Sequence, residues 1–432
     1  MVHVPPADTA FSETPSDLPA SPTPPIPTPS AAEPPPNWTP RGSAAYWRIV
    51  IGLFLVGYAT FSLIYCVQPL LPIFVREFGV SPAESSLSLS LTTGCLAISI
   101  LVFGALSENL GRKWLMFGSM AVAASLNVAV AFYPEWYLLL AARTAVGIAL
   151  GGVPAVAMAY LAEEIEPKGL GLAMGLYVGG TAYGGMTGRV ITGYLADHFT
   201  WPFAMGFIAA TALLSALCFA LLLPDSKNFS RRRGLKIADH FANWGRHLRN
   251  PRLRLLFVVG FLAMGGFVTV YNYIGFHLLA PPFSLSQGTV SLIFTAYTFG
   301  ILSSFFAGAI SDRIGRGPVL TGGMILALAG LSLTLTGSVI ATVVGISILT
   351  IGFFAAHSTA SSWVGQTAQG AKGHAASLYL LAYYIGSSVL GSSGGWVFSL
   401  GEWPAVAAFC AVAWAITALI AWKLQLSARA RA

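Results

Sequence analysis

Two arginines lie inside long apolar stretches of the sequence, where an isolated positive charge is costly. Arg143 and Arg189 are both surrounded by apolar or small residues. A charged side chain within a membrane-spanning helix must be paired or hydrated, so such a residue marks a candidate functional site. We expect these arginines to bind an anionic group of a substrate or to control the protonation of a neighbouring site. The alternatives are snorkelling to the membrane surface and hydrogen bonding to backbone carbonyls.

Polar, aromatic and titratable side chains in the apolar stretches complete the set of candidate site residues. Tyrosines and amides could line a cavity that suits an aromatic or amphiphilic substrate; they are Tyr65, Gln68, Tyr271, Asn272, Tyr273, Tyr383 and Tyr384. For tyrosines near the ends of helices the alternative is an interfacial belt. His277 and His357 are candidates to carry a proton, with packing as the alternative for each.

Acidic side chains are absent from the middle of every apolar stretch. All sixteen lie in the first 40 residues, in loops or at the edges of these stretches. The sequence therefore offers no carboxylate in the middle of the membrane for proton coupling. Phosphate-binding loops, nucleophile elbows and metal-ligand clusters are also missing, which argues against an enzyme, an ATP-driven pump and a bound cofactor or metal.

The composition places these residues in a membrane protein. Apolar residues make up 55% of the chain and charged residues only 9%, with a mean hydropathy of +0.71. A soluble domain carries roughly 25% charged residues. Twelve apolar stretches are long enough to cross a bilayer, and each must be helical because lipid offers the backbone no hydrogen-bond partners. They cover residues 49–75, 85–106, 114–132, 136–161, 169–195, 203–223, 255–279, 288–309, 319–336, 338–361, 374–396 and 404–424. Pro154 is expected to kink the fourth.

The lysines and arginines predict the orientation of these twelve helices. Most of the 23 basic residues fall on one side if both termini are cytoplasmic, and this is the expected bias. The net charge of +7 therefore reflects topology and does not predict nucleic-acid binding.

Five segments follow from the same patterns. Half of the 26 prolines lie in the first 40 residues, which predicts a disordered cytoplasmic tail. The segments are the tail 1–44, a six-helix bundle at 45–223, a basic cytoplasmic linker at 224–254, a second six-helix bundle at 255–425 and a short cytoplasmic tail at 426–432. Within the linker, Ile237, Phe241, Trp244 and Leu248 share one face of an amphipathic helix suited to an anionic lipid surface.

The two bundles share an internal repeat. Residues 104–112 (GALSENLGR) match residues 308–316 (GAISDRIGR), and Trp201-Pro202 matches Trp403-Pro404 at the corresponding place in the second half. Such a duplication predicts an all-α polytopic protein of two pseudo-symmetric six-helix bundles. Its site would lie between the bundles near the middle of the membrane, opened to each side in turn by rocking.

The repeated loop resembles the signature loop of the major facilitator superfamily. Gly180, Gly184, Gly185 and Gly188 resemble the antiporter motif of its drug:proton branch, with Arg189 at the position of the motif's final glycine. Residues 65–72, 153–164, 184–189 and 353–358 together are similar to the acriflavin-sensitivity (YnfM-type) family of bacterial inner-membrane transporters, over roughly residues 45–425.

This resemblance implies that the two signature loops act in gating. Their residues are Gly104, Glu108, Gly111, Arg112 and Lys113 in the first half and Gly308, Asp312, Arg313, Gly315 and Arg316 in the second. We expect these charges to pair across the two halves and with helix ends, and so to hold one state of the gate. The alternative is that they only anchor the topology.

The function that follows is secondary active transport. We expect an inner-membrane exporter that acts as a monomer and exchanges a small, drug-like molecule for protons, with the proton gradient as its energy source. One alternative is an uncoupled or uptake carrier for a sugar or an organic anion. Another is a non-transporting receptor or scaffold that works through the proline-rich tail.

Overall fold

The computed structural model describes residues 37–228 and 237–429, and among them all long elements are helices. The predicted disordered tail and part of the central linker lie outside the described residues. Helices of the first half are α1 (Ala44–Tyr65), α2 (Leu71–Phe78), α3 (Pro82–Leu110), α4 (Arg112–Phe132), α5 (Trp136–Leu150), α6 (Gly152–Glu164), α7 (Pro167–His198) and α8 (Trp201–Leu222). We call residues 37–228 the N-bundle.

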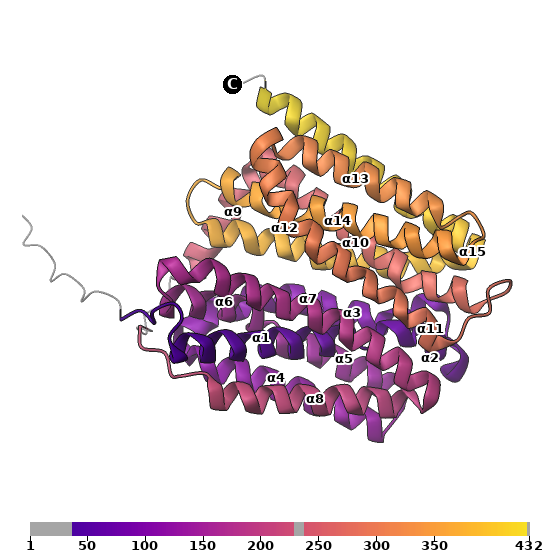
Figure 1. The fold of residues 1–432 in the computed structure, drawn as a ribbon, viewed down its shortest axis with the longest axis horizontal. Helices are drawn as coiled ribbons and strands as arrows, with labels where there is room; N and C mark the ends of the chain where they lie inside the picture. Colours follow the sequence, from indigo (N-terminus) through magenta and orange to yellow (C-terminus); the bar gives the residue numbers. More distant parts are fainter. Residues whose placement is uncertain (1–36, 229–236, 430–432) are drawn as a thin grey trace, which may run out of the picture. The chain divides into compact units, whose positions relative to one another are not determined.

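The second half repeats this arrangement after a short linker helix, α9 (Ile237–Arg249). Its helices are α10 (Pro251–Leu279), α11 (Gln287–Ser291), α12 (Tyr297–Ile314), α13 (Arg316–Leu333), α14 (Val339–Thr367) and α15 (Lys372–Arg429). We call residues 251–429 the C-bundle. Figure 1 shows the N-bundle in indigo and magenta below the C-bundle in orange and yellow.

The described helices account for the twelve predicted membrane crossings. Ten segments are long and apolar enough to span a membrane. One of them, α15, is two helices joined at Gly401 and Glu402, which have non-helical backbone angles. Helix α7 has 32 residues and is also long enough at about 1.5 Å per residue, but its many glycines lower its hydropathy. The all-α fold of two six-helix bundles is therefore confirmed.

Local sequence signals set the ends of several spans. Side chains that accept a hydrogen bond from the first helical turn precede α1, α3, α8, α10 and α14; they are Ser43, Ser81, Thr200, Asn250 and Ser338. The fourth span is interrupted at Gly151, between α5 and α6. Pro154 lies one turn beyond and has no N–H for the carbonyl of Leu150, so the interruption agrees with the predicted kink.

The internal repeat is also a structural repeat. Gly111 separates α3 from α4 with φ +80°, and Gly315 separates α12 from α13 with φ +91°. Both angles lie in the region that favours glycine. The repeated Gly-Arg therefore makes the same sharp turn in each bundle, which starts the next helix at Arg112 and at Arg316.

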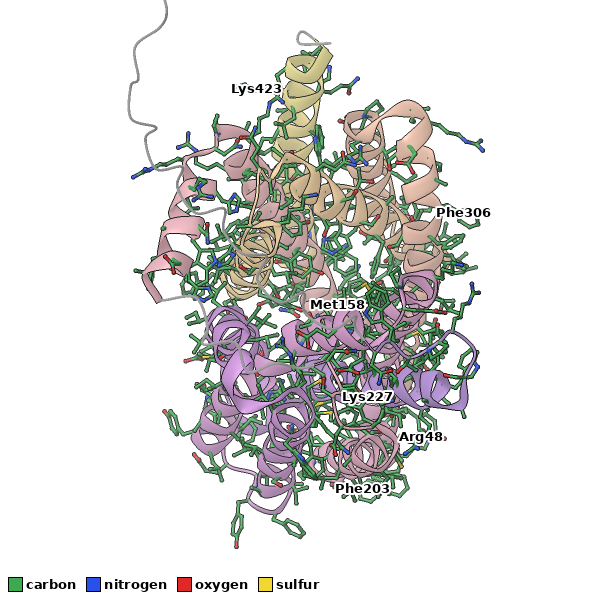
Figure 2. The ribbon with its side chains drawn as sticks, turned by 90° about the vertical axis from the view of Figure 1, so that its left-hand side faces the viewer. Arg48, Met158, Phe203, Lys227, Phe306 and Lys423 are labelled. Atoms are coloured by element: carbon green, nitrogen blue, oxygen red, sulfur yellow. The ribbon has the colours of Figure 1, made fainter. Side chains whose placement is uncertain are left out.

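Large apolar side chains cover the outside of both bundles. Phe203 is 50% exposed and Phe306 is 59% exposed. In Figure 2, which shows the left-hand end of Figure 1, the N-bundle with Arg48 and Phe203 lies below, and the C-bundle with Phe306 and Lys423 lies above. Outward phenylalanines on long helices are suited to a surface that faces lipid.

Candidate functional site

Among the described residues, the hydrogen bonds between the two bundles lie towards one end of the molecule. Each bundle crosses the membrane six times, so the start of α1 and the end of α15 lie on the same side. We call the opposite side, with residues 66–86 and 272–291, the distal end. Figure 1 shows α2 and α11 together at this end, on the right. Side-chain hydrogen bonds between the bundles connect Gln68 with Asn272, Gln287 with Pro69, Ser86 with Ser392, Thr93 and Ser90 with Ser388, and Thr298 with Met186.

All these residues lie in the distal half of their helices. Among the described residues, no hydrogen bond joins the N-bundle to the C-bundle nearer the termini. Met158 of α6 remains 37% exposed and is labelled at the boundary between the bundles in Figure 2. The structure is therefore a conformation closed at the distal end.

Arg189 lies on the boundary between the bundles, just inside this closed end. Its side chain is 1% exposed. Its Nη1 donates to the carbonyl of Gly185 at 2.6 Å, and its Nε donates to Oε1 of Gln68 at 2.5 Å. The guanidinium carbon is 3.9 Å from the ring centroid of Tyr65 in the N-bundle and 4.7 Å from that of Tyr297 in the C-bundle.

These rings compensate the buried charge without neutralising it. A cation over an aromatic face gains up to about 2 kcal/mol when both are desolvated. Phe294 adds a third ring at 5.4 Å. No salt bridge joins Arg189 to any described carboxylate. The guanidinium therefore lies in an aromatic setting with no described carboxylate in a salt bridge to it, and such a setting could attract an anionic or π-rich group.

Gln68 extends this contact across the boundary. It lies in the break between α1 and α2, at the start of a short 3₁₀ segment (Gln68–Leu70), and it is 2% exposed. Its Nε2 donates to Oδ1 of Asn272 at 2.7 Å. Within the described part of the chain, Nδ2 of Asn272 and Oε1 of Gln287 have no hydrogen-bond partner, and both residues line a small cavity at the distal end. Arg189, Gln68 and Asn272 form a continuous polar chain from the N-bundle to the C-bundle.

An aromatic cluster of the C-bundle adjoins this chain. Tyr271 donates to or accepts from Thr350 at 2.8 Å between the two oxygens, and its ring contacts those of Phe294 and Tyr297. His357 is half-buried, with Nδ1 3.0 Å from the hydroxyl of Tyr379 and its ring 4.6 Å from that of Tyr383. His357 is thus a polar group in an otherwise aromatic cluster.

Arg143 occupies a different place and is fully enclosed, with 0% of its surface exposed. Its guanidinium donates to the carbonyls of Leu63, Ile64 and Ser88 and to Oδ1 of Asn127. The first two carbonyls belong to the end of α1, where a helix leaves carbonyls unpaired and favours positive charge. This geometry agrees with the alternative of bonding to backbone carbonyls. Arg143 therefore ties α1, α3, α4 and α5 together within the N-bundle.

His277 is also separate from the group around Arg189. Its ring is stacked on that of Trp403 at 5.6 Å and contacts Phe283. These are partners inside the C-bundle near the end of α10. The structure thus brings together Arg189, Tyr65, Gln68, Asn272 and Tyr271, places His357 in the adjoining aromatic cluster, and leaves Arg143 and His277 in packing positions.

The glycines of the antiporter-like motif bring α7 against α1. Gly180 packs on the backbone of Phe54, Gly184 on that of Tyr58 and Gly188 on that of Ser62. Gly185 supplies the carbonyl that accepts from Arg189. The motif therefore packs α7 closely against α1, and the guanidinium of Arg189 lies within hydrogen-bond distance of Gln68.

The described charges of the signature loops pair within each half in this conformation. Arg112 pairs with Glu163 at 2.5 Å, Lys113 with Asp225 at 3.6 Å, and Arg316 with Asp312 at 3.7 Å. The expected pairing across the halves, which would hold one state of the gate, stays a prediction. Arg313 is exposed, and the side chains of residues 104–110, with Gly104 and Glu108, lie outside the described part; Gly308 lies within α12.

Sequence reasoning missed several contributors to the site. Tyr297, Phe294, Gln287 and the serines Ser86 and Ser392 were not among the candidates, although each lies in or beside an apolar stretch. For Phe294 and Tyr297 the available signal was an aromatic residue within the eighth span. For Gln287 it was an amide directly before that span. Their importance depends on how the two bundles meet, which hydropathy does not describe.

Comparison with known proteins agrees with this architecture. The family model of the Major Facilitator Superfamily matches residues 49–280 and 274–431. The chain is 46% identical over 385 residues to the inner membrane transport protein YnfM of Escherichia coli, covering 89% of this chain and 92% of the relative. It is 44% identical over 366 residues to the MFS-type transporter YybF of Bacillus subtilis, covering 85% and 90%.

Solved structures show the same fold at low identity. The nucleoside transporter NupG superposes with a TM-score of 0.72 at 14% identity, covering 87% of this chain and 99% of that one. A bacterial homologue of the lysosomal transporter Spinster gives a TM-score of 0.67 at 14% identity, covering 89% and 96%. The chain is therefore a multi-pass membrane transporter that belongs to the Major Facilitator Superfamily, and its relatives are of the YnfM type.

Proposed function

We propose that this transporter works by alternating access and exports a small, drug-like molecule in exchange for protons across the bacterial inner membrane. The observation that carries the proposal is Arg189, a buried cation held between aromatic rings of both bundles. A substrate bound there would contact both halves at once. Its binding energy could then favour one arrangement of the bundles over the other.

The closed distal end supports the alternating-access step. Opening this end requires the bonds between Gln68 and Asn272 and between Gln287 and Pro69 to break. Both are single hydrogen bonds between neutral groups, which contribute about 1 kcal/mol each. Neither bond alone is strong enough to prevent a bound substrate from favouring the open arrangement.

The lining supports an amphiphilic or aromatic substrate. Tyr65, Tyr297 and the cluster around Tyr383 offer ring faces, while Gln68 and Asn272 offer amides. Pockets with an apolar aromatic wall and a few polar groups bind such molecules by shape and fix them by hydrogen bonds.

His357 is the candidate for the coupled proton. It is half-buried, its Nδ1 is 3.0 Å from the hydroxyl of Tyr379, and its ring lies beside Tyr383. Imidazole is the side chain that most readily exchanges a proton at physiological pH. A substrate that binds beside Tyr383 would change the surroundings of this ring.

The test is proton movement in sealed proteoliposomes with an imposed pH gradient. A pH-sensitive dye inside the vesicles is followed while cationic dyes, sugars and organic anions are added in turn. We expect one class to trigger a proton flux that Arg189→Gln abolishes and Arg189→Lys partly restores. In His357→Gln we expect substrate movement to persist without the proton signal, whereas Tyr379→Phe removes only the hydrogen bond and serves as its control. A substrate that enters with no proton signal in the unaltered protein would contradict the antiport.

An uncoupled or uptake carrier for an organic anion is the second candidate. The charge of Arg189, which no described carboxylate neutralises in a salt bridge, favours an anionic substrate. In the same vesicles this carrier would move an organic anion down its own gradient, independently of the pH gradient.

A further inference from the structure

A second cavity lies away from the candidate transport site, where the linker helix α9 meets the C-bundle. It has a volume of about 750 Å³. The end of α9, the start of α10 and the end of α14 form its walls, with Arg246, His247, Asn250, Arg252, Trp363 and Gln366 among the lining residues. None of its lining residues is acidic. The cavity is therefore a concave surface of positive charge with amide donors.

Contacts of α9 hold this wall in place. His240 lies 2.9 Å from His374, Trp244 donates to Ser377 at 3.3 Å, and His247 contacts the carbonyl of Ala371 at 3.2 Å. Arg252 is oriented from the opposite side, because its Nη2 donates to the carbonyl of Ser427 at 3.0 Å. The basic groups that line the cavity therefore come from elements that are fixed to the C-bundle.

One exposed strip of α9 is apolar. Phe241 is 65% exposed and Leu248 is 47% exposed, and their spacing places them on one side of the helix. A short helix with exposed apolar residues beside basic ones is suited to the boundary between lipid headgroups and acyl chains. Arg246 lies about 140–160° around the helix from this strip, but Leu248 directly follows His247, so the strip ends where α9 meets the cavity.

We propose that this cavity binds the phosphate headgroup of an anionic phospholipid from the leaflet on the side of the termini. Arg246 and Arg252 would contact the phosphate, since guanidinium groups match the geometry of its oxygens. Asn250 and Gln366 would donate to the remaining headgroup oxygens, while the acyl chains lie along Phe241 and Leu248. The exposed apolar residues favour a lipid, because its acyl chains can contact them, whereas a free phosphate has no apolar part.

The experiment measures the thermal midpoint of the purified full-length protein in neutral detergent. Phosphatidylglycerol, phosphatidylcholine and inorganic phosphate are titrated separately into mixed micelles. We expect phosphatidylglycerol to raise the midpoint in a saturable way, and the other two to have little effect. Arg246→Gln with Arg252→Gln should require at least about tenfold more phosphatidylglycerol for half of the shift.

A matched pair of substitutions separates the cavity from general surface charge. Arg249 and Arg254 are exposed, lie on the same two helices and do not line the cavity. Arg249→Gln with Arg254→Gln removes the same charge and should leave the titration nearly unchanged. Equal weakening by both pairs would overturn the site, as would equal stabilisation by phosphatidylcholine.

Two further outcomes keep the test decisive. If the variant at Arg246 and Arg252 does not fold, Gln366→Glu places a carboxylate in the cavity without changing either arginine. It should weaken the effect of phosphatidylglycerol, and an unchanged titration would contradict the site. Stabilisation by inorganic phosphate as large as that by phosphatidylglycerol would overturn the assignment to a lipid. None of these readouts requires transport, so the result is independent of the proposed function.

Discussion

The two buried arginines of the N-bundle differ in what their charge contacts. Arg143 donates to three backbone carbonyls and to Asn127, so its charge is matched by oxygens of its own bundle. Arg189 instead lies between rings of both bundles and bonds to Gln68 and Gly185. At the residue scale, the first arginine is placed to hold helices together, and we propose that the second responds to a ligand.

Arg143→Gln tests the first of these roles. The substitution leaves carbonyls of α1 and α3 unpaired in a buried position, at a cost of about 1–3 kcal/mol for each group. We expect a clear fall in the thermal midpoint of the detergent-solubilised protein, with transport lost in consequence. Arg189→Gln is the comparison and should lose transport with a much smaller fall. A normal midpoint in Arg143→Gln together with loss of substrate binding would instead place Arg143 in the substrate site.

At the scale of the helix, small residues decide how closely α7 approaches α1. A Cβ at Gly184 would collide with the carbonyl of Tyr58, and one at Gly386 would collide with the carbonyl of Phe261 at the equivalent crossing of the C-bundle. The same helix α7 carries Gly179, around which a Cβ would meet nothing within 4 Å. The repeat therefore conserves a helix crossing as well as a loop.

Gly184→Ala should consequently separate α7 from α1 and displace Arg189 from Gln68. We expect a loss of about 1–3 kcal/mol in stability from overpacking and a marked reduction in transport. Gly179→Ala adds the same methyl group on the same helix and should change neither. Thermal unfolding and vesicle transport would be measured on both variants. Similar behaviour of the two would show that the crossing is not tightly packed.

The helices themselves could be predicted from the sequence, because a membrane leaves an apolar stretch no other structure. The eighth span, however, is predicted as one continuous stretch over 288–309, whereas the structure has α11 followed by a short 3₁₀ segment, Leu292–Ala296, before α12. The split of the fourth span followed from Pro154. These local details depend on backbone hydrogen bonding within each helix. A proline in the sequence predicts where such a bond is missing, whereas hydropathy carries no information about it.

At the scale of the whole molecule, the sequence predicted a site between two bundles but not which residues would meet there. Gln68 and Asn272 are 204 residues apart in the chain and were both candidates, yet their hydrogen bond depends on how the bundles are placed. The same is true of Tyr297 beside Arg189. The partners of the charges in the signature loops have the same dependence, since charges can pair across the halves only at an end where the halves are in contact.

Closure of the distal end can be tested by fixing it. The hydroxyls of Ser86 in α3 and Ser392 in α15 are 3.3 Å apart across the boundary between the bundles. Cysteines at both positions would lie close to the separation that a disulfide requires. In a background in which Cys66, Cys95, Cys218 and Cys410 are replaced, we expect Ser86→Cys with Ser392→Cys to form a disulfide on oxidation. If the bundles must separate at this end in each cycle, oxidation should stop transport and a reducing agent should restore it.

The single substitutions Ser86→Cys and Ser392→Cys are the controls, because neither can form the cross-link and both should transport under oxidising conditions. Substrate binding measured in detergent distinguishes a locked protein from a damaged one. The oxidised double variant should still bind substrate, since the site around Arg189 lies within the closed conformation. Full transport with a complete cross-link would mean that substrate crosses without opening the distal end, and rocking of the two bundles would then not be the mechanism.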